Sequence, residues 1–184
     1  MWPFKVGENI ETKNSDIYTL IFEENVSFHD FEKLPKKASL EEYMTTWFKG
    51  GFPEPLIESV QSTHFHAHWY QNYINNYIRR DIRGLFPRLN IHNFQRFLLS
   101  LAQYSGHQIN MNTIATALEV SNSTIKDYFD IIHQTFIWRN LPVFEKNQLK
   151  KVQKSPRGFF RDQGILHHLL KINSLDDLLL HPVA

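Results

Sequence analysis

Two histidines in the segment HFHAH have a spacing that suits metal binding. His64 and His68 are four residues apart, so they share one face if the segment is helical. Such a pair supplies two nitrogen ligands to Zn²⁺, but a zinc site needs at least a third protein ligand. The chain has no cysteine, and no Asp or Glu is placed by the sequence to fill that role. We therefore favour surface or aromatic-packed histidines, with a zinc pair as the alternative.

A second candidate chemistry is the binding of phosphate by a strip of cations. Residues 139–161 carry seven basic side chains and one acidic one, although the net charge of the whole chain is only +1. Each phosphate that a cation neutralises releases counterions, so this strip could hold a nucleic-acid backbone. A solvated, lysine-rich hairpin is the alternative. The candidate residues are Lys146, Lys150, Lys151, Lys154 and Arg157.

Neither nucleophilic nor acid–base catalysis is predicted. No Gly-x-Ser-x-Gly or Ser-His-Asp arrangement occurs. The carboxylate pairs, such as Glu41-Glu42 and Asp176-Asp177, are adjacent in sequence and would point about 100° apart on a helix. We expect these pairs to be solvated, and we expect the chain not to be an enzyme.

Capping and periodicity predict several helices that would position these residues. Ser39 and Glu42 have the spacing of a capping box that opens a helix through Trp47, and Gly50-Gly51 stops it. Further helices are expected over about 61–82 and 91–104, with Gly106 near the second end. The first of these ends in Arg79, Arg80 and Asp81, where the helix dipole favours the cations by about 0.3–1 kcal/mol.

A helix-turn-helix is predicted over 110–136. Two apolar stripes at helical spacing are joined by a tight turn, and Ser121 can cap the second helix. A DNA-reading helix normally exposes several cations and amides, but here one Lys is outnumbered by two Asp. We expect this helix to pack against protein rather than read the major groove. Its predicted exposed residues are Asn122, Ser123, Lys126, Asp127, Asp130 and Gln134.

After Phe136 the pattern changes to that of strands. Residues 136–144 and 158–162 are β-prone, 149–154 alternate weakly, and two short helices follow over 165–172 and 175–180. Strands after a helix-turn-helix suggest a wing. The predicted fold is mainly α (α+β), a helical bundle with a winged helix-turn-helix and a small terminal β/α portion. The predicted divisions are a loosely structured segment 1–38, a helical lid-like domain 39–106, the winged helix-turn-helix 107–145, and a partial nuclease-like segment 146–184.

Length and hydropathy indicate a cytoplasmic protein. The chain has 184 residues and lacks both a secretory signal and an apolar run near the ~20 residues that cross a bilayer. No membrane partner is expected. The apolar run 178–180 is followed by only four residues, which suggests that the chain is a fragment of a longer one.

Several landmarks occur in an order that resembles a known family. They are GGFPE at 50–54, RDI at 80–82, the helix-turn-helix, and KSPRGFFRDQGI at 154–165. In this order they resemble the C-terminal region of bacterial and archaeal P-loop ATPases of AAA-like type, where a domain of unknown function follows the ATPase core. The resemblance extends over essentially the whole chain, because MWPFKVGE at 1–8 resembles the junction with that core.

The resemblance implies specific roles for a few residues. Arg79, Arg80 and Asp81 would face the nucleotide-binding domain, where an arginine can stabilise phosphate charge. Asp162 would occupy the first acidic position of a degenerate restriction-endonuclease-like site, but one carboxylate does not make a metal nuclease. None of the seven glycines forms a P-loop, so ATP and Mg²⁺ are implied only for a core that this chain lacks.

The function predicted from these residues is that of a non-catalytic interaction or regulatory module of an AAA-like ATPase. It would couple nucleotide state to the ATPase core, another protein partner or self-assembly as a homo-oligomer, and it would bind no cofactor of its own. The alternative is a stand-alone winged-helix DNA-binding protein that uses the basic strip within 146–161. A metal nuclease remnant built on Asp162 ranks last.

Overall fold

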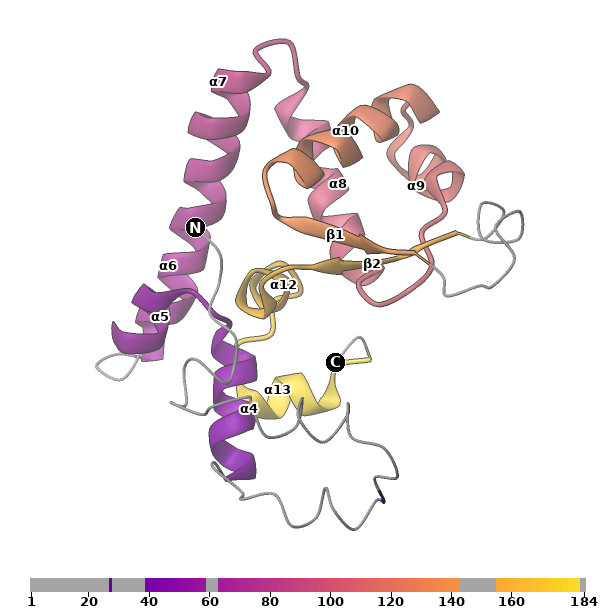
Figure 1. Ribbon diagram of the computed structural model, residues 1–184. Coiled ribbons are helices and arrows are strands. Elements are labelled where there is room, and N and C mark those ends of the chain that lie inside the picture. The colour runs from indigo at the N-terminus through magenta and orange to yellow at the C-terminus, as the bar shows by residue number, and fades with distance from the viewer. Residues whose placement is uncertain (1–26, 28–38, 59–62, 143–154, 183–184) are drawn as a thin grey trace.

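The computed structural model describes Ser27 and residues 39–58, 63–142 and 155–182 (Figure 1). Helices predominate in this part of the chain, with one two-stranded antiparallel sheet. The predicted mainly α, α+β class is confirmed. The expected strand over 149–154 and the predicted segment 1–38, apart from Ser27, lie outside the described residues.

The first described helix begins and ends where the sequence indicates. Helix α4 (Leu40–Lys49) opens with the predicted capping box, in which Ser39 and Glu42 exchange hydrogen bonds. Gly50 ends it at φ +78°, a conformation that favours glycine. Helix α5 (Pro53–Glu58) was not predicted from the sequence. Proline interrupts a helix but is tolerated in its first turn, so Pro53 can begin a new one.

The next helix differs from the single helix expected up to Ile82. It consists of α6 (Thr63–Asn76), a π-helix η1 (Tyr77–Ile82) and one further turn, α7 (Arg83–Leu85). The wider π turn keeps Tyr77 and Ile78 buried together with Ile82, while the charged residues between them stay exposed. The Tyr77 hydroxyl lies 2.6 Å from Thr135 Oγ1, which ties η1 to the end of α10.

The predicted helix-turn-helix is present. Helix α8 (Ile91–Gln103) precedes α9 (Met111–Leu118) and α10 (Asn122–Gln134). The side chains of Asn90, Asn110 and Ser121 accept backbone N–H groups at the three N-termini, as capping residues do. The apolar stripes are buried as expected: Ile114, Ala115, Leu118, Ile125, Tyr128, Phe129 and Ile132.

The sheet brings together segments on either side of the expected boundary near residue 145. Strand β1 (Trp138–Leu141) pairs antiparallel with β2 (Arg157–Phe160), with Trp138 opposite Phe160. The chain just before α9 joins them, because Gln108 forms a bridge with Arg157. Gly158 lets the strands approach, since a Cβ there would lie 1.9 Å from the Trp138 ring.

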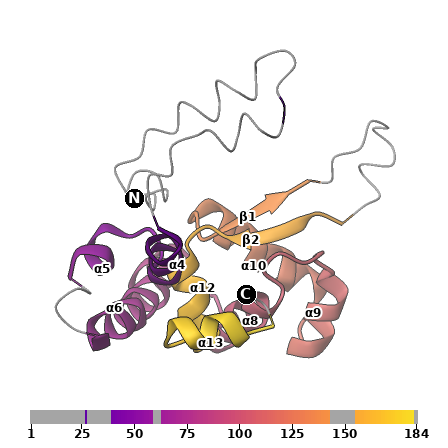
Figure 2. The same ribbon diagram turned by 90° about the horizontal axis from the view of Figure 1, so that it is seen from below.

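Helix α12 (Gln163–Leu169) lies at the centre of the molecule. It contacts α4, α6 and α8, and Figure 2 shows it between the α4–α6 side and the α8–α10 side. The last helix, α13 (Leu175–Leu180), contacts α4. One hydrophobic core cluster extends from Phe52 to Leu166. None of the described helices combines the length and apolar character needed to cross a membrane.

Candidate functional site

Two glycine-containing motifs that are far apart in the sequence meet in the fold. Gly50-Gly51 lies between α4 and α5, and Asp162 and Gly164 lie at the start of α12. The Gly51 N–H donates to Asp162 Oδ2 at 2.7 Å. A Cβ on Gly50 would lie 2.6 Å from the Gly164 backbone nitrogen, so only glycine permits this approach. We call this contact, with the side chains of His66, Tyr70 and His167 around it, the α4 junction.

Asp162 is the acidic group of the α4 junction, and it caps α12. Its Oδ1 accepts the Ile165 N–H at 2.9 Å, and its side chain is buried, with 3% of the residue exposed. Burial raises the pKa of the Asp162 carboxyl, and hydrogen bonds from the Gly51 and Ile165 N–H groups act in the opposite direction. The carboxylate thus links the start of α12 to the turn after α4.

Tyr70 fills the space that the two glycines leave open. Its hydroxyl donates to the Lys49 carbonyl at 2.9 Å, and the residue is fully buried. A Cβ on Gly164 would lie 2.2 Å from the Tyr70 ring carbon Cζ. Burial raises the pKa of Tyr70, and the nearby Asp162 charge adds to the rise, so the hydroxyl stays protonated.

Two buried histidines bind the last carbonyls of α4. His66 Nε2 lies 3.0 Å from the Lys49 oxygen, and His167 Nδ1 lies 2.9 Å from the Phe48 oxygen. A carbonyl only accepts, so each of these nitrogens carries a proton. The Phe48 ring stacks with both imidazoles, at centroid distances of 5.2 Å to His66 and 6.0 Å to His167. The carbonyls at a helix C-terminus have no intrahelical donor, so these side chains satisfy them.

Burial lowers the pKa of both junction histidines. For His66 the hydrogen bond to Lys49 acts in the opposite direction. For His167 the hydrogen bond to Phe48 opposes the effect of burial, whereas His66 and His181 add to it. Both imidazoles are therefore favoured in the neutral form.

The chemistry of the α4 junction is that of attachment between elements. Both Asp162 oxygens already accept backbone N–H groups, and Tyr70, His66 and His167 are bonded to main-chain carbonyls. Among the described residues, no three His, Asp or Glu side chains are grouped so as to hold a metal ion. A metal nuclease needs at least two carboxylates around its cation. At the proposed nuclease-like position the structure places a buried helix cap.

The predicted histidine pair and the buried histidine of HFHAH have different surroundings. His68 is exposed on α6, and the side chain of His64 lies outside the described part of the chain. His66, which was not among the predicted site residues, is the buried one. Its i+4 spacing to Tyr70 on α6 was a usable signal, because both side chains reach the Lys49 carbonyl.

The three charged residues predicted to face a nucleotide domain lie on η1. Arg79, Arg80 and Asp81 are all exposed, and Arg80 Nε pairs with Asp81 Oδ1 at 3.1 Å. The exposed fraction of the Arg80 side chain is 83%, so this ion pair contributes little to stability. The structure brings these residues together with one another but not with the α4 junction.

The basic strip lies mostly beyond the described residues. Of its five members only Arg157 is described, and its guanidinium donates to the Gly106 carbonyl at 2.9 Å. Lys146, Lys150, Lys151 and Lys154 lie outside the described part of the chain. The predicted exposed face of α10 is confirmed, because Asn122, Ser123, Lys126, Asp127, Asp130 and Gln134 are all exposed.

Comparison with known proteins gives a family but no activity. A family model described as Domain of unknown function (DUF8612) matches residues 40–176. Uncharacterized protein Mb2031c of Mycobacterium bovis and uncharacterized protein Rv2008c of Mycobacterium tuberculosis are each 30% identical over 127 residues, or 69% of this chain. The matched region spans only 28% of the length of either relative. No solved structure matches the chain significantly.

Proposed function

The chain belongs to the DUF8612 family of domains of unknown function, and we propose that it is a non-catalytic interaction module of a larger P-loop ATPase of AAA-like type. The observation that carries the proposal is the α4 junction. Its buried acidic, phenolic and imidazole groups are all bonded to the main chain, where they hold α4, α6 and α12 together. Because these groups are already bonded to the main chain, their arrangement favours a structural role over a catalytic one.

The link to an ATPase rests on the order of the sequence motifs. GGFPE and RDQGI, two parts of the resemblance, form the α4 junction in space. The matched region is 28% of each mycobacterial relative, which is consistent with a module of a longer protein. Arg79 and Arg80 are exposed on η1 and available to a second protein surface.

The order of elements supports a winged-helix unit used for protein contact. Helix α8, the segment at Gln108, helices α9 and α10, and strands β1 and β2 follow one another as in a winged helix. Helix α10 exposes Asp127 and Asp130 beside one lysine, and these two carboxylates would repel a phosphate backbone. We propose that α10 faces protein rather than DNA, and that the module acts in the cytoplasm.

The test begins with the DNA upstream of the Met1 codon. If a P-loop reading frame lies there, its product is co-expressed with the 184-residue chain. We expect the two to co-elute in size-exclusion chromatography, and the chain alone to hydrolyse no ATP. We also expect Arg80→Ala to weaken the complex, while the control Arg96→Ala, at an exposed position on α8, leaves it intact.

The DNA-binding alternative gives a different result. It predicts no upstream P-loop frame and a duplex DNA shift that weakens steeply between about 50 and 200 mM salt. That outcome, or the absence of any complex with the ATPase, would contradict the interaction module. Tight ATP binding or turnover by the purified chain would contradict its non-catalytic character.

A further inference from the structure

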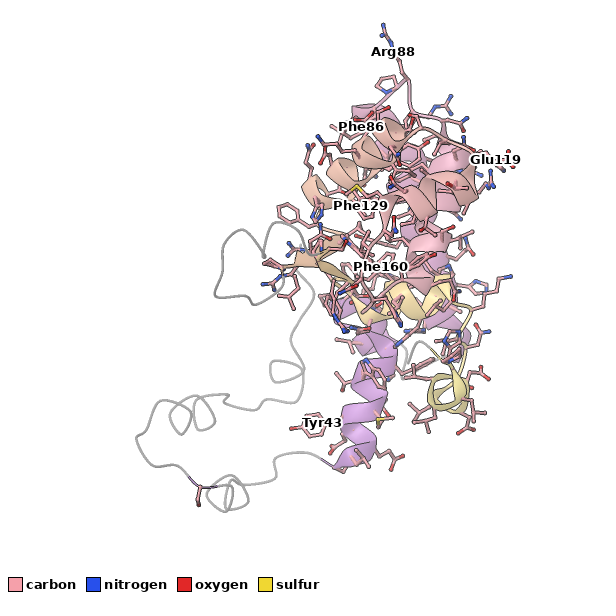
Figure 3. All side chains as sticks on the ribbon, turned by 90° about the vertical axis from the view of Figure 1, so that its right-hand side faces the viewer. Tyr43, Phe86, Arg88, Glu119, Phe129 and Phe160 are labelled. Carbon is pink, nitrogen blue, oxygen red and sulfur yellow. The ribbon has the colours of Figure 1, made fainter. Side chains whose placement is uncertain are left out.

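A groove of about 520 Å³ separates the turn after α7 from the exposed side of α10. One wall is formed by residues 86–89, and the other by Asp127, Asp130, Ile131 and Gln134. Phe86 and Leu89 are half-buried and Ile131 is buried, so the groove has apolar surface between charged edges. Figure 3 shows Arg88 at the end of the molecule, pointing away from the helices, with Phe86 below it.

The two segments that border the groove differ in charge, although Arg88 is the one arginine among the lining residues. Residues 79–88 hold four arginines and one acidic residue, and all five are exposed. The α10 side presents Asp127 and Asp130. Within the described part of the chain, the only ion pair within 4.0 Å is that of Arg80 with Asp81. Among the described residues, therefore, Arg83, Arg88 and the two α10 carboxylates have no ionic partner at that distance.

A surface with adjacent basic and acidic halves is complementary to a copy of itself. Rotation by a twofold axis brings the basic half of one copy onto the acidic half of the other, and the same residues are used twice. Leu85, next to the groove wall, is 66% exposed and would gain apolar contact in the same arrangement. A basic peptide would satisfy only the carboxylates and would leave Leu85 and the arginines uncovered.

We infer that this surface, comprising Arg83, Leu85, residues 86–89 and the Asp127–Gln134 side of α10, is a homodimer contact with twofold symmetry. The inference deepens the proposed function by naming a second copy of this chain as one partner of the module. In the dimer, Arg83 and Arg88 of each copy pair with Asp127 and Asp130 of the other. Such charge pairs determine register and partner choice.

A charge-exchange experiment tests the contact directly. We expect the full chain to form a dimer in sedimentation velocity and light scattering, and raised salt to weaken it. The Asp127→Arg/Asp130→Arg variant should weaken self-association about tenfold or more, and Arg83→Asp/Arg88→Asp should do the same. Mixed in equal amounts, these two variants should form a heterodimer, because opposite charges face each other again.

A control and a folding check complete the design. The Glu54→Arg/Asp176→Arg variant reverses two exposed charges on α5 and α13, away from the groove, and should dimerise like the wild type. Thermal unfolding by circular dichroism confirms that each variant is folded. Restored association in the mixture cannot arise from misfolded chains, so it supports the contact even if one variant is less stable.

Two results would overturn the inference. One is a chain that is monomeric at all concentrations. The other is a dimer that both charge-reversed variants leave unchanged, which would place the contact elsewhere. A monomer that still binds the ATPase product would remove the homodimer and leave the proposed function intact. A dimer that fails to bind that product would keep the homodimer and contradict the proposed function.

Discussion

At the scale of single residues, polar side chains are buried in this protein where they bond to backbone groups that have no partner within their own helix. Asp162, His66 and His167 are at most 9% exposed, and each is bonded to a backbone group near the end of a helix. A buried polar group without a partner costs about 1–3 kcal/mol. These side chains therefore satisfy their own hydrogen-bonding needs and those of the backbone together.

The role of Asp162 predicts a specific loss of stability. Asp162→Asn keeps the shape but replaces one acceptor oxygen with an NH₂ donor. That donor would face the N–H of either Gly51 or Ile165. We expect the free energy of unfolding, measured by urea denaturation, to fall by about 1–3 kcal/mol. Asp176→Asn, at an exposed position on α13, is the matched control and should change little. Equal stability of the two variants would contradict the buried cap.

The junction histidines predict a dependence of stability on acid. Their pKa values are lowered in the folded state, so the native protein binds fewer protons than the unfolded chain. Their contribution is complete above the unfolded pKa of about 6.5 and is lost as the pH falls below it. The raised pKa of Asp162 acts in the opposite sense, because it favours proton binding by the native state.

Replacing the histidines with amides isolates their effect. His66→Gln and His167→Asn place an amide N–H near Nε2 and Nδ1, respectively, and so keep a donor to the carbonyls without a titrating ring. We expect the double variant to lose less stability than the wild type between pH 7 and pH 5, measured by chemical denaturation at each pH. His68→Gln on the same helix is exposed and should leave the wild-type pH profile unchanged. An identical profile in the double variant would exclude the histidines as its cause.

At the scale of elements, glycines decide how closely helices and strands approach. Gly158 lets β2 lie against Trp138 of β1, and Gly164 lets α12 lie against Tyr70 of α6. A Cβ added to either glycine would lie closer to the facing aromatic ring than a Cβ can lie unless its neighbours move. Gly84, in α7, has open space around it instead.

The contrast between these glycines is testable by alanine substitution. Gly158→Ala should destabilise the protein by about 1–3 kcal/mol or more, because the new methyl overlaps the Trp138 ring. Gly84→Ala should stabilise it by about 0.4–1 kcal/mol, because alanine restricts the unfolded chain and meets no atom in the folded one. Thermal or urea unfolding of both variants measures the difference. A destabilised Gly84→Ala, or a neutral Gly158→Ala, would contradict the packing described.

At the scale of the whole molecule, one core links the segments that the sequence divides into separate units. Phe97 of α8 packs against Tyr128 and Phe129 of α10, at centroid distances of 5.3 and 5.1 Å. Phe129 in turn lies 6.4 Å from Trp138 of β1, which meets Phe160 of β2 at 5.1 Å. The lid-like, helix-turn-helix and terminal segments thus share buried aromatic contacts, and their boundaries stay a prediction.

Shared packing predicts cooperative unfolding. Phe97→Ala should lower the free energy of unfolding by about 3–5 kcal/mol, because Phe97 is fully buried. Far-UV circular dichroism and tryptophan fluorescence should still report one coincident urea transition. Leu99→Ala, where the leucine is 49% exposed, is the control and should cost much less. Two separated transitions in the wild type would show that the segments fold independently.

Local signals in the sequence were sufficient for much of the helical architecture. The Ser39–Glu42 capping box, the apolar stripes of α9 and α10, and the cap at Ser121 depend on neighbours within a few residues. Interactions of that range are encoded by spacing alone, so these helices and the exposed face of α10 were predictable. The change to a π-helix at Tyr77 was not predictable, because it accompanies the burial of Tyr77 against the end of α10, which is far along the chain.

By itself, the sequence determined a mainly helical chain with a helix-turn-helix and with no P-loop. Only the tertiary structure decided that Gly51 meets Asp162 across 111 residues, and that His66 and His167 close the end of α4. The physical reason is that these partners are backbone carbonyls, which every residue carries, and backbone N–H groups, which every residue except proline carries. Because these partners are distant in the sequence, no local spacing marks them, and they are identified only when packing brings the helix ends together.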